Sequence, residues 1–319
     1  MTSGPVRRLG EELDELDPAI LTDTADRNAL LEELSYAIRP PIHERRVPSY
    51  GAFVRPERDL ADWAETVGFE MTRRKVDELS DAVVRRFADG IVSWVVRGPA
   101  GVDDLVVFDR SVGSERDLSV LADSTGAAIV QRHPAGVVRA VGRFGVLRYS
   151  GVDWQLEPPV GRWLDLSTCL GGRMEQSLFD NLMRFAVHDV AARRIGSMMI
   201  VAPDGRLLPS AERRYGPPPR FSLRKPADLA PLYHILGQLD GAAVFDEEGV
   251  LRHLGVRLVP SAEAELAVDP YRGTRHTSAL RYSYDDSFAT IVVVSEDGPV
   301  SVVRGGKRLG QSWQTDDRR

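Results

Sequence analysis

The chain has 319 residues, of which 43% are hydrophobic and 28% are charged, and its formal net charge is −6. These values are typical of a globular protein with enough chain for two domains, and they exclude disordered and fibrous classes. A net negative charge argues against broad attraction to the phosphate backbone of nucleic acid, although a local basic pocket for a small anion is compatible with it. We therefore expect no nucleic acid partner.

Cysteine content and the absence of long apolar runs bear on the compartment. A single cysteine, Cys169, cannot form an internal disulfide or a zinc site, and we expect it to be a small buried thiol. The N-terminus lacks the apolar stretch of a signal peptide, and no run of about 18 apolar residues occurs. The sequence therefore predicts a cytoplasmic protein that makes no membrane contact.

The first half of the chain reads as a short arm followed by a small α/β domain. Residues 1–50 are charged and interrupted by prolines, with a short helix expected over 26–38. Apolar residues at three- and four-residue spacing favour one or two amphipathic helices over 59–88. Short β-type segments bounded by turn residues follow at 91–96, 105–108, 127–130 and 137–149. We expect this domain to span 51–170 and to end near two segments rich in turn residues, 157–161 and Gly171-Gly172.

The second half, residues 171–313, predicts a mixed sheet flanked by helices. An amphipathic helix is expected over 174–194 and a second helix over 229–239. Strands are expected at 198–201, 242–245, 250–258, 290–294 and 300–304. Residues 314–319 form a tail that we expect to fray. The fold class is therefore α/β, with this domain preceded by a smaller α/β domain.

Asp240-Gly241 stands between a predicted helix and a strongly β-type segment. Asp-Gly is among the commonest turn dipeptides, so the pair by itself is compatible with a plain turn. Its position at the start of a strand favours a functional role, because α/β sheets present ligand groups at strand ends and glycine lets a flat base approach the backbone.

Gly273-Thr274-Arg275-His276 precedes a predicted helix. A glycine and a threonine before a helix are a routine N-terminus, and arginine is usually a solvated surface residue. In the functional interpretation, Thr274 and the free N–H groups of the first turn receive phosphate oxygens while Arg275 supplies planar, bidentate charge. His276 could then bind metal, orient a phosphate or simply pack.

Ser295-Glu296-Asp297 follows an apolar predicted strand and leads into the next one. The simple interpretation is a hairpin turn. In the alternative, Glu296 and Asp297 stand at the C-terminal end of a strand, where they can reach a hydroxyl, a base edge or a metal.

The order of four segments adds a resemblance to a known family. Arg193 to Val201, Leu239 to Ala242, Gly273 to His276 and Val294 to Asp297 follow one another as in the catalytic domain of diadenylate cyclases, and residues 174–312 are similar to that domain. The resemblance implies that two ATP molecules are condensed into cyclic di-AMP and two pyrophosphates, with Mg²⁺ or Mn²⁺, between two facing copies of the domain.

The resemblance also implies a role for each motif. Asp240 would be the metal ligand that helps to activate a ribose 3′-hydroxyl, with Arg275 and His276 as its catalytic neighbours. The remaining implied nucleotide-binding residues are Gly241, Ala242 and Leu258 around the adenine, Gly273, Thr274, Thr277 and Ser278 at the phosphates, and Ser295, Glu296 and Asp297 beside the nucleotide or metal.

Two departures from the family pattern leave alternatives open. The family usually has a second arginine after Arg275-His276, but Thr277 stands here, and many members have histidine where Leu239 stands. Arg281, Arg304 or the arginine-rich segment 213–220 could supply the missing charge. Besides a cyclase whose N-terminal domain is a sensor, a nucleotide-binding sensor without turnover and an unrelated α/β binding protein remain as alternatives. A purely structural or dimerising N-terminal domain is a further one.

Overall fold

The computed structural model describes residues 4–22, 26–42, 44–58, 70–76, 78–98, 101–165, 174–271, 273–297 and 299–312. The chain separates into two compact units, 1–159 and 160–319, which are described one at a time. The division falls between Pro159 and Val160, about ten residues before the expected position. Cys169, Gly171-Gly172 and the tail over 314–319 lie outside the described residues.

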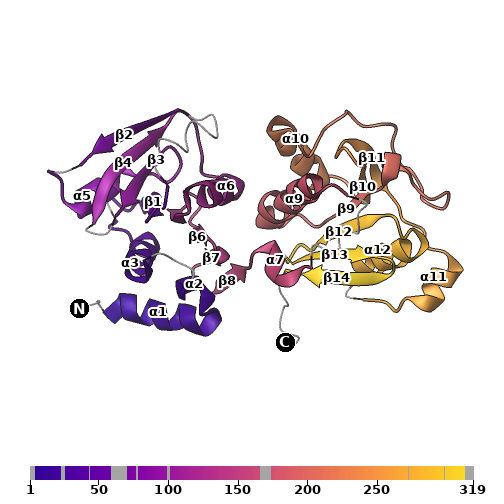
Figure 1. The fold of residues 1–319 in the computed structure, drawn as a ribbon, viewed down its shortest axis with the longest axis horizontal. Helices are drawn as coiled ribbons and strands as arrows, with labels where there is room; N and C mark the ends of the chain where they lie inside the picture. The colour runs from indigo at the N-terminus through magenta and orange to yellow at the C-terminus, as the bar shows by residue number, and fades with distance from the viewer. Residues whose placement is uncertain are drawn as a thin grey trace. The chain divides into compact units, whose positions relative to one another are not determined.

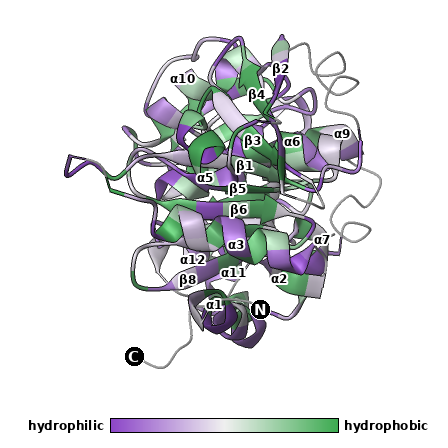
Figure 2. Ribbon diagram, turned by 90° about the vertical axis from the view of Figure 1, so that its left-hand side faces the viewer, coloured by the Kyte–Doolittle hydropathy of each residue, from purple (hydrophilic) through white to green (hydrophobic). Residues whose placement is uncertain are grey.

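The first unit contains an eight-stranded sheet in the order β2-β4-β3-β1-β5-β6-β7-β8. Its strands are β1 (Tyr50–Val54), β2 (Met71–Lys75), β3 (Ser93–Arg97), β4 (Val102–Phe108), β5 (Ala128–Arg132), β6 (Val138–Gly142), β7 (Gly145–Tyr149) and β8 (Trp154–Glu157). Strands β1 and β3 are parallel and the other neighbouring pairs are antiparallel, so the sheet is mixed. The central strands β1, β3 and β5 are mainly apolar (Figure 2).

Helices cover both faces of this first sheet (Figure 1). Helices α1 (Gly4–Leu16), α2 (Ala19–Thr22) and α3 (Arg27–Ile38) share one apolar core with the sheet, in which Leu13, Leu30 and Leu34 are fully buried. Helix α6 (Glu115–Thr125) contributes Leu118 and Leu121 to a second apolar core of this unit. Helix α5 (Asp81–Val84) and the 3-10 turn η1 (Arg85–Phe87) lie beside β3 and β4. Residues 4–22 and 26–38 are therefore built into the unit and do not form a separate arm.

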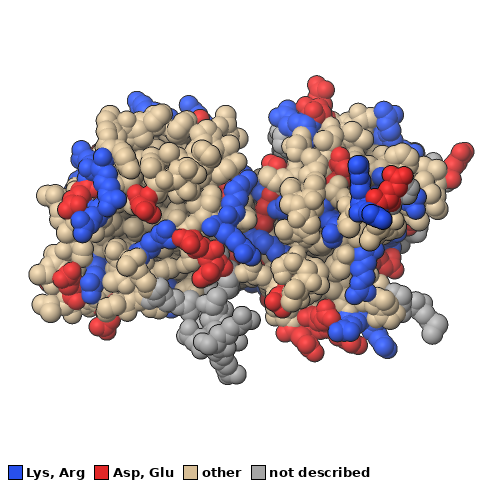
Figure 3. Space-filling model, turned by 180° about the vertical axis from the view of Figure 1, so that it is seen from behind, with Lys and Arg blue, Asp and Glu red and all other residues tan. Residues whose placement is uncertain are grey.

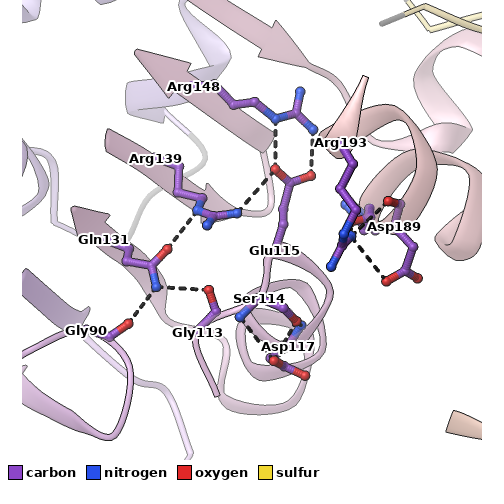
Figure 4. Close-up of polar contacts among 11 residues, drawn as sticks. Gly90, Gly113, Ser114, Glu115, Asp117, Gln131, Arg139, Arg148, Asp189 and Arg193 are labelled. Carbon is purple, nitrogen blue, oxygen red and sulfur yellow. Dashed lines mark hydrogen bonds and ion pairs between the residues drawn. The ribbon is translucent and has the colours of Figure 1, made fainter. Parts of the chain in front are cut away.

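Several elements of this unit, including α1, β1 and β8, differ from the sequence expectation, and two of them show why. Residues 71–75 form the edge strand β2, paired antiparallel with β4, where we expected helix. Burial explains the difference, because Thr72 to Lys75 are exposed on an edge strand and need no apolar alternation. The other is helix α6, which was not expected from the sequence. Its start is fixed by a capping box between Ser114 and Asp117 (Figure 4).

Buried polar groups tie α6 to the sheet (Figure 4). Glu115 is 3% exposed and accepts hydrogen bonds from Arg148 Nε at 2.8 Å and Nη2 at 2.5 Å. Gln131, fully buried in β5, donates to the carbonyls of Gly90 and Gly113 and accepts from Arg139 Nε at 2.7 Å. Glu115 and Gln131 thus both have hydrogen-bond partners, which is what their removal from water requires.

The second unit contains a six-stranded sheet in the order β11-β10-β9-β12-β13-β14. Its strands are β9 (Ser197–Val201), β10 (Ala242–Phe245), β11 (Leu251–Val256), β12 (Thr290–Val294), β13 (Val300–Arg304) and β14 (Lys307–Gln311). Strands β9 and β10 are parallel and the other neighbours are antiparallel. This mixed sheet confirms the predicted fold class.

Two helical layers enclose the second sheet (Figure 1). One face carries α9 (Gln176–Arg184), a π-helical segment (Phe185–Val190), a 3-10 turn (Ala191–Arg193) and α10 (Pro226–Leu236), with the short helix α7 (Val160–Trp163) beside β14. The other face carries α11 (Ala262–Ala267) and α12 (Thr274–Asp285). The single helix expected over 174–194 is therefore divided into three segments. Its end is held by Arg193, which donates to the carbonyl of Asp189 at 2.8 Å (Figure 4).

Basic and acidic side chains lie interspersed on the face shown in Figure 3. This agrees with the composition of the chain, which contains 41 Lys and Arg and 47 Asp and Glu.

Candidate functional site

A cavity of about 880 Å³ opens at one end of the second sheet. Strands β9 and β10 begin at this end, and the antiparallel strands β11 and β12 finish there. The N-terminus of α12 meets them in the same cavity. Opposite strand directions therefore bring the segment before β10 together with the segment after β12, although the two are far apart in sequence.

The cavity gathers nearly all of the residues that the sequence singled out. Its lining includes Asp240, Gly241, Leu258, Gly273, Thr274, Arg275, His276, Thr277, Ser278, Ser295, Glu296 and Asp297. Ala242 is the exception. It is fully buried in β10, opposite Val256 of β11, so its side chain belongs to the core of the sheet.

Gly241 allows the chain before β10 to lie directly against β11. Its φ is +102°, and a Cβ built on it would lie 2.6 Å from the carbonyl carbon of Gly255 and 2.9 Å from the carbonyl oxygen of Val256. Any side chain here would collide with backbone, which cannot give way as a flexible side chain can. The exposed carboxylate of Asp240 is thereby fixed at the edge of the cavity.

Arg275 and Glu296 form an ion pair across the cavity, with 3.0 Å between Nη1 and Oε1. Gly196, just before β9, lies under this pair: a Cβ there would be 2.3 Å from Arg275 Nη1 and 2.7 Å from Glu296 Cγ. Gly196 was not among the predicted site residues, although it belongs to the segment from Arg193 to Val201 that carries the resemblance. The pair connects the first turn of α12 to the end of β12.

The N-terminus of α12 is oriented to receive an anion. Gly273 is its N-cap at φ +118°, and no side-chain hydrogen bond caps the helix. A helix leaves its first N–H groups without intrahelical partners, and its dipole favours negative charge at that end. Because Gly273 to Ser278 line the cavity, a phosphate bound there would meet these groups.

Thr277 and His276 are both engaged within the protein. The Thr277 hydroxyl accepts from the N–H of Tyr271 at 3.0 Å and donates to the carbonyl of the same residue at 3.2 Å. His276 is 7% exposed, with its Nε2 3.4 Å from Ser301 Oγ and its ring edge-on to Tyr271. Of the three alternatives for His276, this geometry corresponds most closely to packing.

Four arginines line the cavity, and only one of them, Arg275, belongs to a predicted motif. Arg275 pairs with Glu296, Arg257 lies 3.4 Å from Glu212, and Arg281 lies 3.8 Å from Glu265. Arg214 is the fourth. The sequence indicated only that the arginine-rich segment 213–220 could supply positive charge, without singling out Arg214. Arg304, also considered as a source of charge, instead lines a separate cavity of about 250 Å³ and donates to the carbonyl of Ser287.

Carboxylates balance these arginines in the lining, which contains Asp240, Glu265, Glu296 and Asp297. In the described part of the chain, no cluster of three or more His, Cys, Asp or Glu side chains is arranged to hold a metal ion.

Comparison with known families agrees with this arrangement. Residues 184–308 match the family model described as "DisA bacterial checkpoint controller nucleotide-binding", and residues 7–157 match the one described as "Probable sensor domain DACNK". The C-terminal part of the chain belongs to the diadenylate cyclase domain family, and the part before it matches the model of a probable sensor domain. The domain therefore has a diadenylate cyclase-like nucleotide-binding fold.

Two solved structures are similar to part of the chain. One is described as a hypothetical membrane spanning protein from Bacillus cereus, at 25% identity, covering 46% of this chain and 69% of that one, with a TM-score of 0.35. The other is a double mutant of DacA from Staphylococcus aureus, at 20% identity, covering 44% and 88%, with a TM-score of 0.28. No curated protein matches the chain. Within the described residues, every helix is too short or too polar to cross a membrane.

Proposed function

We propose that the protein is a cytoplasmic diadenylate cyclase that condenses two ATP molecules into cyclic di-AMP and two pyrophosphates. One observation carries the proposal: a single cavity of about 880 Å³ holds the carboxylate of Asp240, the guanidinium of Arg275 and the N-terminus of α12. Its volume is in the range of cavities that hold cofactor-sized ligands. It lies in a domain that matches a nucleotide-binding family.

The reaction requires positioning and charge neutralisation more than covalent chemistry. In each half, a ribose 3′-oxygen forms a bond to the α-phosphorus of the other ATP, the bond from that phosphorus to the bridging oxygen breaks, and pyrophosphate leaves. The hydroxyl proton passes to a base or to solvent. Asp240 is suited to orient the 3′-hydroxyl and to favour loss of its proton, because its carboxylate is exposed at the cavity edge.

The two ends of the nucleotide would contact different parts of the cavity. The adenine would lie near Gly241 and Leu258, where the chain approaches β11 without side chains in between. The phosphates would lie at the first turn of α12, where backbone N–H groups and Arg275 provide donors. Binding phosphate would then draw Arg275 away from Glu296.

A divalent cation fits the donor set only together with substrate. Mg²⁺ and Mn²⁺ prefer oxygen ligands, and Mg²⁺ is usually bound through one or two carboxylates plus substrate phosphates. Asp240 would hold such an ion, with Glu296 or Asp297 nearby in the same cavity. When bound, the ion would supply charge neutralisation for the phosphates and lower the pKa of the attacking hydroxyl.

Self-association follows from the reaction itself. Each cavity would hold one ATP, and each 3′-hydroxyl must reach the α-phosphate of another ATP. Two cavities from two copies of the chain, facing each other about a twofold axis, satisfy both requirements at once. We propose that the N-terminal sensor domain controls how readily the two copies meet.

A second candidate is a nucleotide-binding sensor that does not turn over. Two observations favour it: the Thr277 side chain is engaged with Tyr271 instead of offering a positive charge, and Leu239 replaces a possible metal ligand. In this case the cavity would bind ATP and the protein would signal through occupancy.

One experiment separates these candidates. The full-length protein is incubated with ATP and Mg²⁺ or Mn²⁺ over a range of protein concentrations, and cyclic di-AMP is sought by chromatography and mass spectrometry. Product whose specific rate rises with protein concentration supports the cyclase. ATP binding without product supports the sensor, and absence of any nucleotide binding contradicts both.

A further inference from the structure

The loop between β9 and α10 is attached to the rim of the cavity by backbone pairing. The N–H of Glu212 donates to the carbonyl of Arg257 and the N–H of Arg257 donates to that of Glu212, both at 3.0 Å. Their side chains add an ion pair at 3.4 Å. Arg214 follows two residues later, so its backbone position is set by this pairing and not by a free loop.

A second contact fixes the chain on the other side of Arg214. The ring of Tyr215 lies over Gly255, where a Cβ would come within 2.4 Å of the ring carbon Cε2. The same Cβ position is 3.4 Å from the carbonyl oxygen of Asp240. Tyr215 therefore lies against β11 beside the segment that carries Asp240. Arg214 is held between two anchored neighbours while its own side chain lines the cavity.

The charge balance of the cavity distinguishes Arg214 from the other arginines. Arg257, Arg275 and Arg281 each have a carboxylate within 4 Å. Arg281 also donates from Nε to the carbonyl of Val268. Among the residues that the structure describes, no carboxylate lies within ion-pair distance of Arg214. Its guanidinium is therefore the one that can neutralise an incoming anion without first giving up a protein partner.

We propose that Arg214 binds the phosphate chain of the nucleotide and supplies the positive charge that Thr277 does not. This rests on the proposed function, because it requires that the cavity take a nucleotide polyphosphate. A guanidinium suits that role, since its planar donors can bind two phosphate oxygens at once. Adenosine, which lacks phosphate, should not depend on Arg214.

Binding measurements on the full-length protein test the proposal. Calorimetric titrations with 3′-deoxy-ATP, which lacks the attacking hydroxyl and cannot be condensed, are compared with titrations with adenosine. Arg214→Ala should weaken 3′-deoxy-ATP binding about 10- to 100-fold, the range expected for a hydrogen bond to a charged group. Adenosine affinity should stay the same, and Arg214→Lys should recover part of the loss. Arg220→Ala, in the same loop but outside the cavity lining, is the matched control.

The outcomes separate this inference from the proposed function. If the wild type binds 3′-deoxy-ATP and Arg214→Ala binds it equally well, Arg214 is not a phosphate ligand and only this inference fails. If the wild type binds neither 3′-deoxy-ATP nor ATP, the proposed function fails as well. Equal loss of adenosine and 3′-deoxy-ATP affinity would indicate a damaged cavity and would also contradict a phosphate-specific role.

A second variant asks whether Arg214 replaces the missing charge. Thr277→Arg should restore most of the 3′-deoxy-ATP affinity lost in Arg214→Ala, and it should give a smaller gain in the wild-type background. The coupling arises because either guanidinium can neutralise the same phosphates. If Thr277→Arg raised 3′-deoxy-ATP affinity by the same factor in both backgrounds, the two positions would act independently. That result would contradict the proposal that Arg214 supplies the charge missing at Thr277.

Discussion

The four arginines and four carboxylates that line the cavity balance in formal charge, but only some of these residues are held in ion pairs. Arg275 and Glu296 are paired across it, whereas the carboxylate of Asp240 is exposed at its edge. An anionic ligand must therefore compete with Glu296 for Arg275, but it does not need to displace anything to approach the N-terminus of α12.

Asp240→Asn should abolish product formation without preventing ATP binding. The substitution keeps the shape of the side chain and an oxygen acceptor but removes the charge, so the side chain can no longer take the proton of the 3′-hydroxyl or hold a metal ion as a carboxylate. We expect the rate of cyclic di-AMP formation to fall by at least about 100-fold, the lower end for loss of a general base. ATP affinity measured without added divalent metal should change by less than about threefold. Asp269→Asn, an exposed carboxylate outside the cavity lining, is the control. Unchanged turnover in Asp240→Asn would exclude Asp240 from the reaction.

Gly196→Ala should disturb the cavity and leave the fold nearly intact. The added methyl group would meet Arg275 Nη1 and Glu296 Cγ, which are parts of flexible side chains that can move aside. We expect KM for ATP to rise severalfold, and the free energy of unfolding to change by less than about 1 kcal/mol. Gly161→Ala, where nothing lies within 4 Å of the new methyl group, should change neither quantity. A variant with unaltered KM would mean that the position of the Arg275–Glu296 pair is unimportant for binding.

Among the helices and strands, the sequence predicted best the positions of candidate site residues that lie directly before a helix or a strand. Asp240-Gly241 before β10 and Gly273 before α12 carry turn and N-cap signals beside strong periodicity, and both lie where expected. The remaining segments were harder to predict, because their structure depends on burial and on contacts with residues that are distant in the sequence. Residues 71–75 follow no apolar alternation because β2 is an exposed edge strand. The position of Arg214 depends on pairing between Glu212 and Arg257, 45 residues apart, which local signals do not encode.

The turn before β3 is held by a carboxyl group whose ionisation should make the stability of the first unit depend on pH. Asp89 Oδ1 accepts hydrogen bonds from the N–H groups of Ile91 and Val92 at 2.8 Å and of Ser93 at 2.9 Å. Burial opposes ionisation of this carboxyl, but the hydrogen bonds outweigh it and lower its pKa. Because the pKa is lower in the folded state, the ionised carboxylate stabilises the fold above the unfolded pKa of about 4, and this stabilisation is lost as the pH falls further.

Asp89→Ala should therefore destabilise the first unit by about 1–3 kcal/mol near neutral pH, because three N–H groups lose their acceptor. The difference in unfolding free energy between wild type and variant should shrink below about pH 4. Urea unfolding between about pH 7 and pH 3.5 measures it. Asp89→Asn, which keeps an oxygen acceptor but no charge, should be less destabilised near neutral pH. A difference for Asp89→Ala that did not vary with pH would contradict a role for the ionised form.

At the scale of the whole molecule, the proposed reaction makes activity a property of two copies. Specific activity should rise with protein concentration until all copies are paired, since an unpaired domain holds only one ATP. A constant specific activity over a wide concentration range would instead require a preformed dimer or a reaction within one chain.

Mixing wild type with the Asp240→Asn variant distinguishes those possibilities. If each Asp240 serves the 3′-hydroxyl in its own cavity, a cyclic product needs two intact cavities, whereas a mixed pair can form only one of the two phosphodiester bonds. After random pairing of equal amounts, about one quarter of the pairs carry two intact sites, so cyclic di-AMP per wild-type chain should fall by about half relative to wild type at the same total concentration. The mixed pairs should accumulate a linear dinucleotide that carries a triphosphate, detectable by mass spectrometry. A wild-type rate that the variant does not reduce, with no linear product, would show that each chain acts alone and would remove the facing-domain arrangement from the proposal.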